Sequence, residues 1–129
     1  MSHFSTIKTE LRDRDALVAA LTALGHAPAA GPCQVRGYRG QLETADLVIS
    51  ASNGGDLGFR WNVANGAFEL VTDLDLWSLP VPPERFLTQL NQRYALEAIL
   101  AASAAEGFQV SEQTTQQDGG IELVVTRWA

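Results

Sequence analysis

Apolar and polar positions alternate most clearly between Leu57 and Asp73. This stretch predicts two strands that meet at Asn65-Gly66, because a tight hairpin turn needs residues that tolerate positive φ. A two-residue turn would set three pairs in register, namely Val63 with Phe68, Trp61 with Leu70, and Phe59 with Thr72. The hairpin is therefore the element around which we arrange the rest of the chain.

The period of two gives this hairpin an apolar side and a polar side. Trp61 lies on the apolar side, and we expect it in the core. The other side carries Arg60, Asn62, Glu69, Val71 and Asp73. We expect that polar side to face water or a partner.

Apolar residues at helical spacing predict two helices. Asp13 or Asp15 caps the first, which runs to Leu24. The second runs over residues 84–106 and follows Pro83, which suits the first helical position because its missing N–H costs nothing there. Its apolar surface is wider than one stripe, so we expect it to be well buried.

Further strands are predicted at residues 4–11, 45–51, 108–113 and 121–128. Residues 25–44 are rich in Gly and Pro and predict a long loop with at most a short extended piece at 34–38. The order is β-α-β-β-β-α-β-β in a single domain of 129 residues. We expect an α+β fold, with a mainly antiparallel sheet, two helices on one face and a ferredoxin-like plan.

The amino-acid composition of the chain disfavours several classes of function. Nine basic residues against fifteen acidic ones, and a net charge of −6, disfavour nucleic-acid binding, which depends on Lys and Arg at phosphates. No apolar run approaches the roughly 20 residues that span a bilayer, and no signal peptide is evident. A single cysteine, Cys33, excludes an internal disulfide. We expect a soluble intracellular protein, and a homo-oligomer is compatible with all of this.

No motif indicates catalysis, a cofactor or a metal. His3, His26 and Cys33 lack the spacing of a zinc site. Cys33 has arginines nearby in the sequence but no fixed base, so we interpret it as a spectator. The Gly-rich segments match neither a dinucleotide-binding fingerprint nor a P-loop.

The aromatic residues suggest a surface for a protein partner. Trp77 lies in a proline-rich connection, and an exposed Trp beside charged residues is a typical interface anchor. Arg93 and Tyr94, on the second helix, would support it from below. The first hypothesis is therefore a non-enzymatic interaction module whose contact residues are Arg60, Asn62, Glu69, Asp73, Trp77 and Arg93.

The alternative is a domain that binds a small anionic ligand or effector, with weak enzymatic activity as an extension. Arg36, Tyr38 and Arg39 form a basic and aromatic group in the long loop. Such residues can neutralise an anion and stack on it. A solvated loop explains the same residues without a ligand.

The chain also resembles the family called hypothetical chloroplast open reading frame 35, small proteins of algal plastids and cyanobacteria. The segments that carry the resemblance are Met1–Thr9, Gly58–Asn62, Glu69–Leu74, Trp77, Arg85–Leu87, Gln92–Ala95, Gly107–Val110, Asp118-Gly119, Leu123–Val125 and Arg127-Trp128. They cover essentially the whole chain in order. The resemblance implies a setting, the cytoplasm of a cyanobacterium or the plastid stroma, and no reaction, cofactor or catalytic residue.

Overall fold

The computed structural model describes residues 3–115 and 121–127. Two short turns of 3-10 helix, η1 (Tyr38–Gly40) and η2 (Leu74–Leu76), lie among the main elements. These elements are, in order, β1 (Phe4–Lys8), α1 (Arg14–Ala23), β2 (Ala29–Arg36), β3 (Leu42–Ile49), β4 (Leu57–Asn62), β5 (Ala67–Asp73), α2 (Pro83–Ala105), β6 (Phe108–Thr115) and β7 (Ile121–Arg127).

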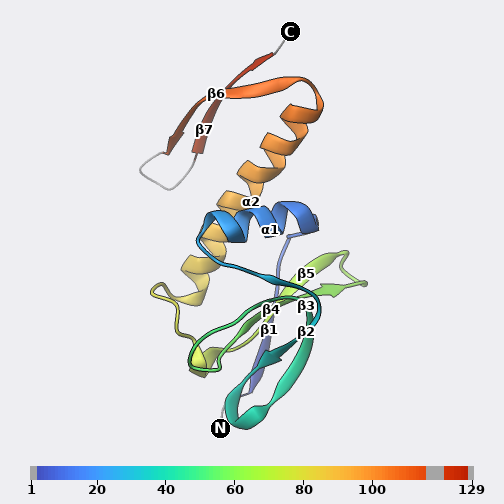
Figure 1. Cartoon of the computed structure of the whole chain (residues 1–129), viewed down its shortest axis with the longest axis vertical. Coiled ribbons are helices and arrows are strands. Elements are labelled where there is room, and N and C mark those ends of the chain that lie inside the picture. Colours follow the sequence, from blue (N-terminus) through green and yellow to red (C-terminus); the bar gives the residue numbers. More distant parts are fainter. Residues whose placement is uncertain (1–2, 116–120, 128–129) are drawn as a thin grey trace.

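The fold is α+β, as predicted. Five antiparallel strands form one sheet in the order β1-β5-β4-β3-β2, and both helices lie on one side of it (Figure 1). The predicted element order lacked one strand, since β2 occupies part of the segment expected to be a loop. The ferredoxin-like plan is not confirmed, because β6 and β7 form a two-stranded sheet of their own.

The extra strand β2 contains residues that usually interrupt strands. Gly31 has a φ of 96°, and Pro32 follows it. Both fall in a register shift between Ala30 and Cys33, where β2 departs from regular pairing with β3. Because β2 is the edge of the sheet, a proline and a bulge are tolerated there.

The register of the central hairpin differs from the predicted one by two residues. Trp61 lies opposite Phe68, and Phe59 lies opposite Leu70. The connection is thus the four residues 63–66 instead of two. A shift of two residues leaves every side chain on its predicted side of the sheet, so the division into two sides is correct although the pairing was wrong.

The main core lies between the sheet and the two helices. Asp13 caps α1, and its Oδ1 accepts hydrogen bonds from the backbone N–H groups of Asp15 and Ala16. Pro83 occupies the start of α2, as predicted. The largest side chains of this core are Leu11, Leu17, Leu21, Leu47, Ile49, Leu57, Phe59, Phe68, Leu70, Phe86 and Leu90.

The other face of the sheet carries a smaller apolar cluster, because the sheet is curled. Val35, Ala45 and Val48 are buried together there, with Phe4 packed against them. The Phe4 ring, on one edge strand, also lies against Gly37, just after the strand at the opposite edge. The two edges of the sheet therefore approach each other on the side away from the helices.

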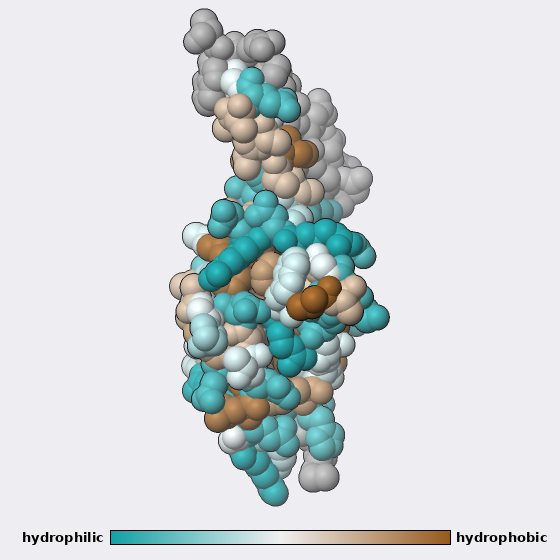
Figure 2. All heavy atoms as spheres, turned by 90° about the vertical axis from the view of Figure 1, so that its right-hand side faces the viewer, coloured by the Kyte–Doolittle hydropathy of each residue, from teal (hydrophilic) through white to brown (hydrophobic). Residues whose placement is uncertain are grey.

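The far part of α2 and the C-terminal hairpin project from the rest of the molecule (Figure 1). Leu96 is the last fully buried side chain of the helix, and apolar colouring continues on the projecting part (Figure 2). In the part of the chain that the structure describes, no helix combines the length and the hydrophobicity that a membrane span requires.

Candidate functional site

Three of the predicted contact residues converge on the polar side of the hairpin. Arg60 Nε lies 2.9 Å from Glu69 Oε1, and Asn62 Nδ2 lies 3.1 Å from Glu69 Oε2. Arg60 also reaches Glu43, with 3.4 Å between Nη1 and Oε2. The pKa of Glu69 is lowered, first because Asn62 donates to it and also because of Arg60, while burial opposes both.

These polar residues satisfy one another instead of facing a free surface. Glu69 is only 8% exposed and Asp73 only 1%, and Val71 is buried as well. Asp73 lies apart from the Glu69 group and accepts hydrogen bonds from the backbone N–H groups of Tyr38 (3.3 Å) and Asp75 (3.2 Å). The expectation that this side faces water is wrong for these three residues, because the curled sheet covers them.

Trp77 is half-buried and packs against the main core, which corrects the prediction of an exposed anchor. Its indole N–H donates to Val81 O at 2.7 Å, and its ring meets Phe86 edge to face at 5.6 Å. Arg93 pairs along the helix with Glu97 at 2.9 Å. Both residues therefore have structural partners within the chain.

Of the residues predicted to bind a small anion, Arg36 is already paired within the chain and Arg39 is exposed. Arg36 forms a bidentate ion pair with the buried Asp56. The distances from Arg36 Nε to Asp56 Oδ2 and from Arg36 Nη2 to Asp56 Oδ1 are both 2.9 Å. Burial would raise the pKa of Asp56, but hydrogen bonds from Arg36 and Ala51 outweigh it and lower the pKa. Arg39 stays exposed, with its guanidinium 5.2 Å from the centre of the Tyr38 ring.

Trp61 is 39% exposed, so the expectation that it lies in the core is wrong. Its ring still meets Phe68 edge to face, with 5.1 Å between centroids. Val63, two residues on, is 86% exposed. Residues 61–66, which we term the hairpin tip, thus place two large apolar side chains in solvent.

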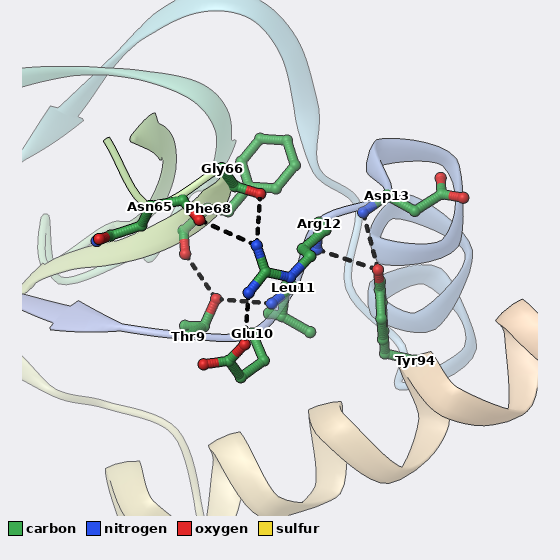
Figure 3. Close-up of polar contacts among 9 residues, drawn as sticks. All are labelled: Thr9, Glu10, Leu11, Arg12, Asp13, Asn65, Gly66, Phe68 and Tyr94. Carbon is green, nitrogen blue, oxygen red and sulfur yellow. Dashed lines mark hydrogen bonds and ion pairs between the residues drawn. The ribbon is translucent and has the colours of Figure 1, made fainter. Parts of the chain in front are cut away.

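A clamp holds the hairpin tip from the segment between β1 and α1 (Figure 3). Arg12 Nη1 donates to both carbonyls at the end of the turn, those of Asn65 (2.9 Å) and Gly66 (3.1 Å). Arg12 Nη2 also pairs with Glu10 Oε2 at 2.8 Å. The Arg12 guanidinium therefore binds the turn, and its pairing with Glu10 holds it in position to do so.

The same segment is tied to α2 and to β5. Tyr94 Oη accepts hydrogen bonds from the backbone N–H groups of Arg12 (3.0 Å) and Asp13 (2.8 Å). Thr9 Oγ1 donates to Phe68 O at 2.6 Å. The expected role of Tyr94, support of Trp77, is replaced by this one (Figure 3). The hairpin tip is thereby connected to both helices.

Sequence reasoning missed this clamp, because its parts are far apart in the chain. Arg12 and the turn it binds are separated by more than 50 residues. The one local signal is Asn65-Gly66, whose turn leaves carbonyls without strand partners. Nothing in the sequence says which donor reaches them.

The site offers two exposed apolar side chains beside a turn that Arg12 binds. Among residues 3–107, whose side chains the structure describes, no three side chains of His, Cys, Asp or Glu gather as a metal site would require. Cys33 is half-buried, with its Sγ 3.4 Å from Ala30 O.

Comparisons with known proteins place the chain in a family. A family model described as "Protein of unknown function (DUF1257)" matches residues 20–124. A protein named "Uncharacterized protein ycf35" from Guillardia theta is 40% identical, over 99% of this chain and 98% of its own length. Proteins of the same name from Pyropia yezoensis and Cyanophora paradoxa are 36% and 37% identical over the same shares. The chain belongs to the ycf35 family.

This membership confirms the resemblance noted from the sequence. The relatives' names state no reaction, ligand or partner. No solved structure matches the chain significantly. The function must therefore be argued from the geometry.

Proposed function

We propose that the chain is a non-enzymatic protein-interaction module and that the hairpin tip is its contact surface. The observation that carries the proposal is the exposure of Trp61 and Val63 on a turn fixed by Arg12. Trp is enriched among residues that dominate binding energy at interfaces. A turn that is already ordered loses little conformational entropy on binding, which favours affinity.

The predicted contact residues keep a part in this proposal. Arg60 and Asn62 precede and follow Trp61 in β4 and are partly exposed, but their side chains lie on the opposite side of the hairpin, where a partner that grips the hairpin tip from both sides would meet them. Glu69 holds both in place from β5. Asp73, Trp77 and Arg93 stabilise the fold behind it, and the anchor role passes from Trp77 to Trp61.

A photo-crosslinking residue tests the contact surface. Placed at position 63, it should trap a discrete adduct in plastid extract from one of the algae named above. The matched control places the same residue at position 42, because Leu42 is 51% exposed but lies on β3. Trp61→Ala should abolish the adduct formed from position 63. Equal adducts from both positions, or an adduct that survives Trp61→Ala, would remove the proposal.

A second candidate function, binding of a small anion, rests on Arg39. This residue holds a φ of 54°, which is unusual for a residue other than glycine. Its guanidinium is exposed above Tyr38, and no carboxylate pairs with it among the described residues. Phosphate and citrate should then raise the melting temperature of the wild type and not of Arg39→Ala. A flat response in both proteins counts against this function.

We propose the cytoplasm of a phototroph or the plastid stroma as the setting, and the plastid relatives support this proposal. We expect a protein partner and, given fifteen acidic residues against nine basic ones, no nucleic acid. Fluorescence anisotropy with labelled DNA and RNA at low salt checks the second expectation, and binding that weakens steeply with salt would contradict it.

A further inference from the structure

The chain contains two Asn-Gly pairs, Asn53-Gly54 and Asn65-Gly66. In such a pair the backbone nitrogen of glycine can reach the side-chain amide carbon of the asparagine, because glycine has no Cβ to obstruct the approach. The reaction that follows is deamidation. From the sequence alone the two pairs are equivalent, so any difference between them comes from the fold.

The backbone does not distinguish the two pairs. Gly54 N donates to Ala51 O at 3.0 Å, and Gly66 N donates to Asn62 O at 2.9 Å. Both glycines have positive φ, 81° and 62°. The attacking nitrogen is therefore engaged to the same extent at both positions.

The side chains differ. Asn53 Nδ2 donates to Leu76 O at 2.8 Å, and Asn53 Oδ1 accepts from Gly55 N at 2.9 Å. Its amide is held at both ends. Asn65 is exposed, its amide makes no hydrogen bond with any described residue, and it points away from the contacts of the clamp (Figure 3). The amide of Asn65 can therefore rotate toward Gly66 N, whereas that of Asn53 must first break two hydrogen bonds.

We propose that Asn65 is a site of spontaneous deamidation and that the fold protects Asn53. Gly66 N attacks Asn65 Cγ and gives its proton to water. The bond from Cγ to the side-chain nitrogen then breaks, and that nitrogen takes a proton from water and departs as ammonia. A cyclic imide remains. Water then opens the imide at either carbonyl, which yields aspartate or isoaspartate. Each product adds one negative charge to the hairpin tip, and isoaspartate also adds a methylene to its backbone.

Arg12 sets the rate of this reaction. Ring closure moves the backbone between Asn65 and Gly66, and Arg12 Nη1 holds the carbonyl of each. Arg12→Ala releases both carbonyls while leaving the surroundings of Asn53 unchanged. The loss of an exposed charged hydrogen bond predicts deamidation at Asn65 that is about three- to tenfold faster, with no change at Asn53.

The test follows the intact chain in mildly alkaline buffer at 37 °C, with mass spectrometry of its tryptic peptides. Cleavage after Arg39, Arg60 and Arg85 puts the two asparagines on different peptides. The folded wild type should gain the mass of an amide-to-acid exchange on the peptide with Asn65 and not on that with Asn53. In urea both peptides should convert at similar rates, which shows that the fold makes the difference.

Equal conversion of both peptides in the folded chain would overturn the proposal. So would no conversion of Asn65 over a period in which the unfolded chain converts. Arg12→Ala is first checked by circular dichroism for a folded spectrum, and an unchanged rate at Asn65 in the folded variant would remove the role of Arg12. If that variant does not fold, Arg12→Lys, which keeps the charge but has a single donor nitrogen, replaces it. It should deamidate at Asn65 faster than the wild type, and an unchanged rate in this folded variant would likewise remove the role of Arg12.

Discussion

Gly58 lies in β4 at the point where the curled sheet touches itself, and a side chain there should destabilise the fold. A Cβ at this position would overlap Val35 Cγ2 and stand 3.0 Å from Ala45 Cβ. Its φ lies outside the left-handed region, so the cost of Gly58→Ala comes from lack of space. Overpacking of a close-packed interior costs about 1–3 kcal/mol, and we expect a loss of stability in that range.

A second substitution tests the cause. Val35→Ala removes the methyl groups that the new Cβ would meet, and alone it should cost about 1–2.5 kcal/mol for lost burial and the cavity left behind. In the double variant the alanine at 58 occupies the space freed at 35. The double variant should therefore lose less free energy of unfolding than the two single variants lose together, by about 1 kcal/mol or more. Urea unfolding of the four proteins gives the coupling energy.

The control pairs Gly58→Ala with Leu90→Ala, since Leu90 is buried on α2, on the helix side of the sheet, and is not on a strand next to β4. Those two losses should add within about 0.5 kcal/mol. Additive losses for Gly58→Ala and Val35→Ala, or a Gly58→Ala variant as stable as the wild type, would refute the packing of β2 across β4.

Two further predictions concern polar groups. Tyr94→Phe removes the acceptor for two backbone N–H groups and should cost about 0.5–1.5 kcal/mol by urea unfolding, whereas Tyr38→Phe, whose hydroxyl bonds to no described residue, should cost less. The lowered pKa of Asp56 implies a contribution to stability that is complete above the ordinary pKa of about 4 and is lost as pH falls through the pKa of the folded protein. Asp56→Asn should therefore differ most from the wild type in the urea midpoint at neutral pH and least in acid; a constant difference would contradict this.

The sequence predicts the sides of the central hairpin correctly because alternation is a local property. It does not predict the register, because the turn is widened by contacts that Asn-Gly alone does not reveal. Asn62 Oδ1 accepts hydrogen bonds from Ala64 N at 3.0 Å and from Asn65 N at 3.3 Å, which supports a four-residue connection. Arg12 then binds the end of that connection from a distant segment.

Burial of the polar side is likewise beyond local reasoning. Alternation shows that Glu69 and Asp73 share a side, but not that the sheet curls over them. The curl depends on β2, and β2 carries Gly31 and Pro32, which are typical of loops. The same error hid the Arg36–Asp56 ion pair, since Arg36 ends this strand. One missed strand therefore accounts for the corrections to Glu69, Asp73 and Arg36.

The exchange of roles between Trp61 and Trp77 follows from where neighbouring elements end. The connection that bears Trp77 folds onto the core, where Phe86 and a carbonyl receive its indole. β3 pairs with β4 only from Leu47 to Ile49, so the ladder between these two strands ends before Trp61, which is paired on its other edge with Phe68 of β5. Its backbone N–H is instead taken by the Asp46 carboxylate at 2.7 Å. A capped edge resists the addition of another strand, so a partner at the hairpin tip would contact the side chains of Trp61 and Val63 instead of extending the sheet.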